Sequence, residues 1–156
     1  MAIPNTPFKF CWRSKTSFFI MDIELLKANS EQGDSISQYT LACCYYTGNG
    51  LEKNYEKAVA LWKSAAEKGH ALSYFNLGYC YYYGDGIVQD YEKAVEWLKK
   101  GVENNNADAQ CLLGICYRDG TGVEQDIIKA AELWGESALQ GNKKAYEELQ
   151  KVIPGL

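Results

Sequence analysis

The sequence predicts an all-α protein: a right-handed α/α superhelical solenoid of about three helix-turn-helix repeats, with a capping helix at each end. The segment 77–100 reads LGYCYYYGDGIVQDYEKAVEWLKK, and segments 41–64 and 113–136 align with it at a step of about 36 residues. Each copy carries Gly-x-Gly at its middle, followed by Asp or Asn and then a Lys-Ala segment of helical character. A fixed period of this length is typical of a solenoid, in which each unit buries its apolar face only against its neighbours.

The repeat period divides the chain into six parts. Residues 1–21 do not match the repeat, and 22–34 form a lone second helix that acts as an N-terminal cap. Residues 35–70, 71–106 and 107–142 are the three repeats, and 143–153 form a C-terminal capping helix. Atypical ends are expected, because the terminal units of a solenoid have a neighbour on one side only.

Two antiparallel helices are expected in each repeat. The first helices span 35–47, 71–83 and 107–119, and the second span 55–68, 91–104 and 127–140. The first helices share a leucine, a small residue and a tyrosine on one face, and the small residue lets the paired helix approach closely. On the second helices, Trp62 and Trp134 are the large core residues, and Trp97 is one position out of register with them.

The glycine pairs between the two helices are interpreted as structural. Glycine after a helix end takes the left-handed backbone that stops the helix. A phosphate-binding loop would need a preceding strand or a Lys-Ser/Thr pair, and neither accompanies the glycine pairs. Asn54, Asp90 and Asp126 follow the glycines, and we expect each to be the N-cap of the next helix.

The first 21 residues do not have the pattern of a targeting signal. Their uninterrupted apolar run, 18–21, is much shorter than the core of a signal peptide or a membrane span. Two interpretations remain open: a poorly ordered tail, or a start-site artefact in which Met21 is the true beginning.

The charge distribution gives no reason to expect a nucleic acid partner. The net charge is −4, whereas nucleic-acid-binding domains are typically basic. Residues 1–21 hold Lys9, Arg13 and Lys15 and no acid, so they carry +3 and leave −7 for the remainder. An acidic body favours a partner with a basic face.

The six cysteines are predicted to be reduced. Cys44, Cys80 and Cys116 occupy the same position in successive repeats. Such positions lie about 8–10 Å apart in stacked helices, which is too far for a disulfide. Cys43 and Cys111 have no partner cysteine on a second helix. Reduced cysteines favour a reducing compartment, most simply the cytoplasm.

Residues that could carry chemistry are few. His70 is the only histidine, and we expect it to be an exposed turn residue with no partner. There is no Cys-x-x-Cys pair or histidine cluster, so no metal or cofactor site is predicted. The chain is therefore predicted not to be an enzyme, with no catalytic residues.

The repeats resemble the Sel1-like repeat (SLR), a short relative of the tetratricopeptide repeat. That pattern runs from Leu-Gly through Tyr, Gly-x-Gly-Val, Asp and Lys-Ala to an aromatic residue, Ala-Ala and Gly. The second and third copies match it almost position by position, and the first departs mildly at Ala42 and Asn54. The match covers about residues 26–149.

The resemblance implies a non-catalytic protein-interaction module or adaptor, whose first helices line a concave face that binds a peptide or partner helix. The first-helix positions outside the core stripe are the candidate partner-binding residues: Thr40, Cys43, Thr47, Asn76, Tyr79, Tyr83, Leu112, Ile115 and Asp119. Alternatively, these side chains pack between adjacent repeats.

Two other functions stay open at this point. Cysteine-rich bacterial relatives in the resembled family are linked to binding or hydrolysis of β-lactams, but this chain has no Ser-x-x-Lys and lacks their cysteine pairs. The chain could also be a structural subunit of a larger complex, because three repeats are near the lower limit for independent stability.

Overall fold

The computed structural model describes residues 22–153, and the predictions made for the first 21 residues lie outside them. The described part is all-α, with eight helices and no strand. In chain order these are α1 (Ile23–Glu31), α2 (Ser35–Thr47), α3 (Tyr55–Glu67), α4 (Ala71–Tyr83), α5 (Tyr91–Glu103), α6 (Ala107–Asp119), α7 (Ile127–Leu139) and α8 (Lys143–Val152). None of these helices is long and apolar enough to cross a membrane.

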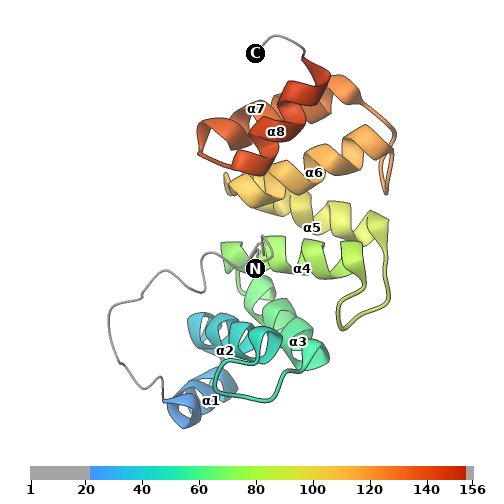
Figure 1. Cartoon of the computed structure of the whole chain (residues 1–156). Coiled ribbons are helices and arrows are strands. Elements are labelled where there is room, and N and C mark those ends of the chain that lie inside the picture. Colours follow the sequence, from blue (N-terminus) through green and yellow to red (C-terminus); the bar gives the residue numbers. More distant parts are fainter. Residues whose placement is uncertain (1–21, 154–156) are drawn as a thin grey trace, which may run out of the picture.

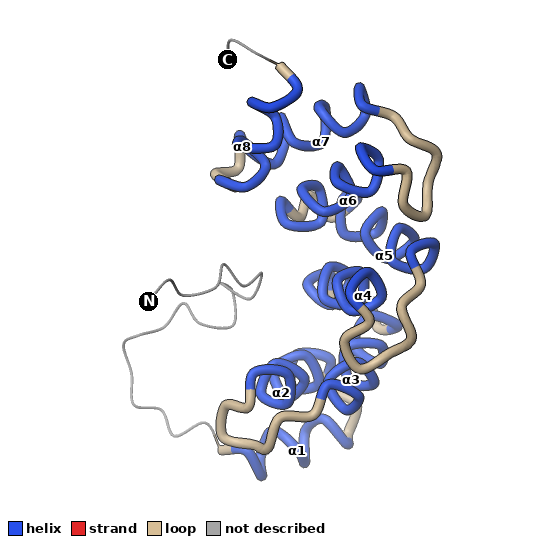
Figure 2. Tube along the Cα trace, turned by 45° about the vertical axis from the view of Figure 1, so that its right-hand side comes forward, coloured by secondary structure: helices blue, strands red, loops and turns tan. Residues whose placement is uncertain are grey.

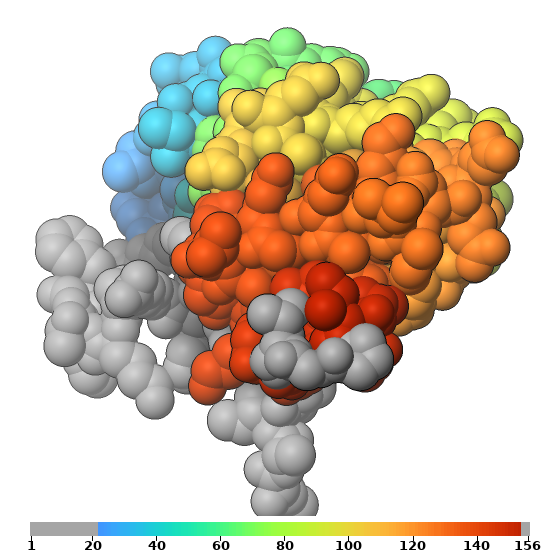
Figure 3. Space-filling view, turned by 90° about the horizontal axis from the view of Figure 1, so that it is seen from above, coloured from blue at the N-terminus to red at the C-terminus, as the bar shows by residue number. Residues whose placement is uncertain are grey.

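The helices stack in chain order into a curved rod, from α1 at one end to α8 at the other (Figure 1). Figure 2 shows α2, α4, α6 and α8 along the concave side of the curve, with α3, α5 and α7 behind them. Seen from the C-terminal end, α7 and α8 lie across the end of the stack (Figure 3). The predicted α-solenoid is therefore confirmed.

The predicted caps explain where the helices begin and end. The side chains of Asn54, Asp90 and Asp126 each accept a hydrogen bond from the backbone N–H three residues later, at 2.8–3.0 Å. The first helices end at Gly48, Gly84 and Gly120, all in the left-handed conformation. The same local signals therefore fix the same turn in every repeat.

Close approach of the paired helices depends on the small residue in the first helix. A Cβ added to Gly114 would lie 2.5 Å from Nε1 of Trp134, and one added to Gly78 would lie 2.7 Å from Leu98. Both of these large side chains are fully buried. The indole N–H of Trp134 donates to the carbonyl of Cys111 at 3.1 Å, which satisfies its only polar group.

The cysteine prediction is confirmed at four positions and wrong at one. Cys44, Cys80, Cys111 and Cys116 are buried free thiols, and burial raises the pKa of Cys80 to about 12. Cys43 is disulfide-bonded, so spacing within the repeats alone did not decide its state. Assignment of the chain to the cytoplasm stays a prediction.

Candidate interaction surface

The inner face is formed by the exposed sides of α2, α4 and α6, which lie next to one another on the concave side of the stack (Figure 2). Among the nine candidate residues, Tyr83, Thr47 and Asp119 are exposed, and Thr40 and Tyr79 are partly buried. The other four are buried: Cys43, Asn76, Leu112 and Ile115. Leu112 and Ile115 belong to the core cluster around Trp134. The accessible part of the face is therefore smaller and more polar than the helical spacing indicates.

A tyrosine cluster, defined here as Tyr46, Tyr79, Tyr83 and Asp85, joins the inner face to the loop after α4. The ring centroids of Tyr79 and Tyr83 are 4.5 Å apart, and Tyr46 donates its hydroxyl hydrogen to the Asp85 carboxylate at 2.6 Å. Burial, followed by electrostatic interaction with Tyr83 and Asp85, raises the pKa of Tyr79 to about 12. The tyrosines are therefore neutral at physiological pH, and one of them, Tyr46, binds the Asp85 carboxylate.

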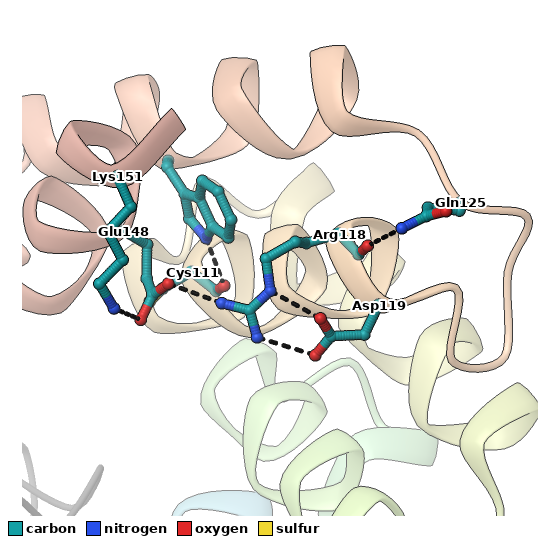
Figure 4. Close-up of polar contacts among 7 residues, drawn as sticks. Cys111, Arg118, Asp119, Gln125, Glu148 and Lys151 are labelled. Carbon is teal, nitrogen blue, oxygen red and sulfur yellow. Dashed lines mark hydrogen bonds and ion pairs between the residues drawn. The ribbon is translucent and has the colours of Figure 1, made fainter. Parts of the chain in front are cut away.

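The C-terminal end of the inner face is charged. In Figure 4, Arg118 of α6 donates to both oxygens of Asp119, at 2.6 and 2.8 Å, and to Glu148 of α8 at 2.6 Å. Lys151 binds the other oxygen of Glu148 at 2.8 Å. This network ties the capping helix to the last repeat, and it holds Asp119 in an ion pair.

Four residues of this surface were missed by the sequence analysis: Tyr46, Asp85, Arg118 and Glu148. Tyr46 and Arg118 are one position before the predicted ridge of the first helix, and their side chains reach the next unit along the stack. Their positions within the repeat could be read from the sequence. The residues that they contact, 39 positions after Tyr46 and 30 positions after Arg118, could not.

The prediction that His70 is exposed and without a partner is wrong. Its ring centroid lies 4.5 Å from that of Tyr39, and its Nδ1 lies 3.1 Å from Oγ of Ser73. A histidine beside a serine can serve nucleophilic catalysis, but Ser73 is fully buried in the first turn of α4. The contact therefore lies at the start of α4, with the serine side chain inside the packed stack.

We expect His70 to make stability depend on pH. Burial lowers its pKa, against a smaller raising effect of Asp34, so the unfolded chain binds the proton more readily than the folded one. Stability should therefore be greatest above pH ~6.5 and fall as the pH decreases towards the lowered pKa. In urea unfolding, the stability of wild type relative to His70→Asn should decrease from about pH 7.5 to 5.5. If the difference in the free energy of unfolding between wild type and His70→Asn stays constant over this range, the pKa of His70 is not lowered in the folded protein.

No group of three or more potential metal ligands occurs among residues 22–153. On the inner face, Thr40 and Thr47 donate to carbonyls of their own helix. Asp119 pairs with Arg118, and Tyr46 donates to Asp85 of the next repeat. What this surface offers is aromatic and acidic side chains on a rigid helical scaffold.

The family model described as Sel1 repeat matches residues 35–70, 71–106 and 107–142. The chain belongs to the Sel1 repeat family. Proteins built from Sel1 repeats are generally protein-interaction modules, and the family is typically non-enzymatic.

Solved structures with the same repeat agree with this assignment. A Sel1 repeat protein from Oxalobacter formigenes is 35% identical, with a TM-score of 0.73, over 83% of this chain and 98% of that one. The protective antigen c5321 of uropathogenic Escherichia coli, which has an SLR fold, is 33% identical with a TM-score of 0.75. That match covers 80% of this chain and 27% of c5321, so this chain spans about a quarter of the antigen's length.

More distant similarity extends to the fold alone. Cysteine rich protein B of Helicobacter pylori is 20% identical, with a TM-score of 0.65, over 82% of this Sel1 repeat chain and 95% of that protein. A search among curated proteins found no match.

Proposed function

We propose that this Sel1 repeat protein is a non-catalytic interaction module that binds a peptide or helix of a protein partner on its inner face. The observation that carries the proposal is the tyrosine cluster. It places aromatic rings on helices whose ends are fixed by caps, and Tyr83 remains 47% exposed. Tyrosine side chains often dominate the binding energy of an interface, because they contribute a large area at a small entropic cost.

Rigidity supports the same function. The contacts between Tyr46 and Asp85, and between Arg118 and Glu148, join neighbouring units of the stack. A partner therefore meets side chains that are already in register, and less conformational entropy is lost on binding.

The proposal is tested by comparing how much partner protein the wild type and Tyr83→Glu capture from an extract of the native cell. We expect the amount of captured partner to fall about 30-fold, as for loss of an interface residue worth about 2 kcal/mol. The helical circular dichroism and the melting temperature should stay unchanged, because the side chain is half exposed.

Val88→Glu is the matched control, since it adds the same charge at an apolar side chain that is 85% exposed in the neighbouring loop. This variant should capture the partner as wild type does. If wild type and both variants capture equal amounts of the partner, the partner does not bind the inner face.

A further inference from the structure

Asp85 is an acidic residue held in a fixed position in the loop after α4. It stands between Gly84 and Gly86, which both have a left-handed backbone, with φ +79° and +69°. A Cβ added to Gly86 would collide with the backbone of Tyr55, so this loop packs closely on the start of α3. The hydroxyl of Tyr46 donates to Oδ2 of Asp85 at 2.6 Å. Backbone packing and a hydrogen bond therefore both fix the carboxylate.

The carboxylate of Asp85 has no cation beside it. No lysine or arginine among residues 22–153 forms an ion pair with it, whereas Asp119 in the next repeat is paired with Arg118 at 2.6 Å. The second oxygen of Asp85, Oδ1, accepts no hydrogen bond from these residues and is not sealed from solvent. This oxygen is therefore open to a donor from another molecule.

The exposed tyrosine ring beside Asp85 also lacks a cation. Tyr83 is 47% exposed, its ring centroid lies 4.5 Å from that of Tyr79, and no lysine or arginine of the described residues lies over it. In every repeat, by contrast, a lysine of the second helix lies 5.3–5.9 Å from the ring centroid of another first-helix tyrosine: Lys57 over Tyr45, Lys93 over Tyr81 and Lys129 over Tyr117. The chain thus satisfies those tyrosine rings with its own cations and leaves Tyr83 to an external one.

The charge of Asp85 acts on both rings of the inner face. Burial is the main cause of the raised pKa of Tyr79, about 12, and Tyr83 and Asp85 follow. The pKa of Tyr83 is raised too, first by burial, then by two cysteines and by Asp85. A cation placed on the ring of Tyr83 would therefore be attracted by the ring and by the carboxylate together.

We propose that the tyrosine cluster is the subsite for an arginine side chain of the partner, whose guanidinium group stacks on Tyr83 and donates to Oδ1 of Asp85. This deepens the proposed function, on which it rests, by naming the chemistry that the partner presents. Arginine suits the site better than lysine, because a guanidinium group stacks on an aromatic ring and is more weakly hydrated than an ammonium group. The net charge of −7 beyond residue 21 favours the approach of such a basic peptide.

Three capped pentapeptides test this assignment, each with two alanines on either side of arginine, citrulline or lysine. Binding to the full chain is followed by NMR, through the ring signals of Tyr79 and Tyr83. We expect a Kd of about 1–10 mM for the arginine peptide, as for one anchoring side chain, and binding at least about tenfold weaker for citrulline, which keeps the shape without the charge. Lysine should bind less tightly than arginine. Equal binding of the arginine and citrulline peptides, equal binding of the arginine and lysine peptides, or ring signals that do not shift would overturn the proposal.

Asp85→Asn tests the carboxylate, because asparagine keeps an oxygen for Tyr46 and loses the charge. Binding of the arginine peptide should weaken about tenfold, and binding of the citrulline peptide should stay the same. Glu124→Gln is the matched control, since it removes the same charge at an exposed position of the corresponding loop after α6. It should leave the arginine peptide unaffected. Equal effects of the two variants, or no effect of Asp85→Asn, would overturn the role of Asp85.

The two proposals fail in different ways. If the arginine peptide does not bind but capture of a partner still depends on Tyr83, only the arginine subsite is wrong. If the arginine peptide binds through Asp85 but no captured partner depends on Tyr83, the interaction function is wrong and the arginine subsite remains.

Discussion

Gly122→Ala is expected to lower the free energy of unfolding by about 3–5 kcal/mol, from the cost of a left-handed side chain and of overpacking against backbone. Gly122 has φ +72°, and an added Cβ would collide with the backbone of Tyr91 and lie 2.9 Å from the amide nitrogen of Glu92. These atoms belong to the start of α5 in the preceding repeat, where the backbone has little room to move. Chemical denaturation followed by circular dichroism measures the loss.

Gly141→Ala is the control that separates conformation from contact. Gly141 also has positive φ, +88°, but nothing lies within 4 Å of its added Cβ. We expect a loss of only about 1–2 kcal/mol, the cost of the left-handed backbone alone. Equal losses for the two variants would contradict the close packing of each loop on the preceding repeat.

The second large effect is expected for Trp134→Ala. The side chain is fully buried in the core of the last repeat, so its removal should cost about 3–5 kcal/mol through lost burial and the cavity left behind. Because units of a solenoid contact only their neighbours, hydrogen exchange should increase first in α6, α7 and α8. Urea unfolding gives the total loss, and exchange gives its location.

Trp97→Ala is the matched truncation. Trp97 is one position away from the repeat position of Trp134, is partly buried, and stacks on Tyr74 at 6.0 Å. A loss of about 1–2 kcal/mol is expected, mainly from its aromatic contact and partial burial. If Trp97→Ala lowered the free energy of unfolding as much as Trp134→Ala, burial of the side chain would not explain the difference expected between these two neighbouring repeat positions.

The helices could be predicted from the sequence because their ends depend on local signals. Caps such as Asp90 and stops such as Gly84 act within four residues, and the first helices begin and end at the expected residues. The second helices end one residue earlier than expected, at Glu67, Glu103 and Leu139, because the next residue has already left the helical conformation and acts as the C-cap.

The accessible part of the inner face could not be predicted in the same way. Helical spacing shows which residues share a face, but the depth of a side chain depends on the neighbouring unit. Ile115 has the spacing of a surface residue and yet is only 8% exposed, so Ile115→Glu would test folding instead of binding. Asp85 joins the surface through Tyr46, which is 39 residues away.

Photo-crosslinking from position 83 tests the central claim most directly, with a crosslinking amino acid in place of Tyr83 in the full, reduced chain and position 88 as the comparison. The account predicts an adduct with a partner protein from position 83 and none from position 88. An adduct from position 88 with none from position 83 would contradict the inner face as the binding surface.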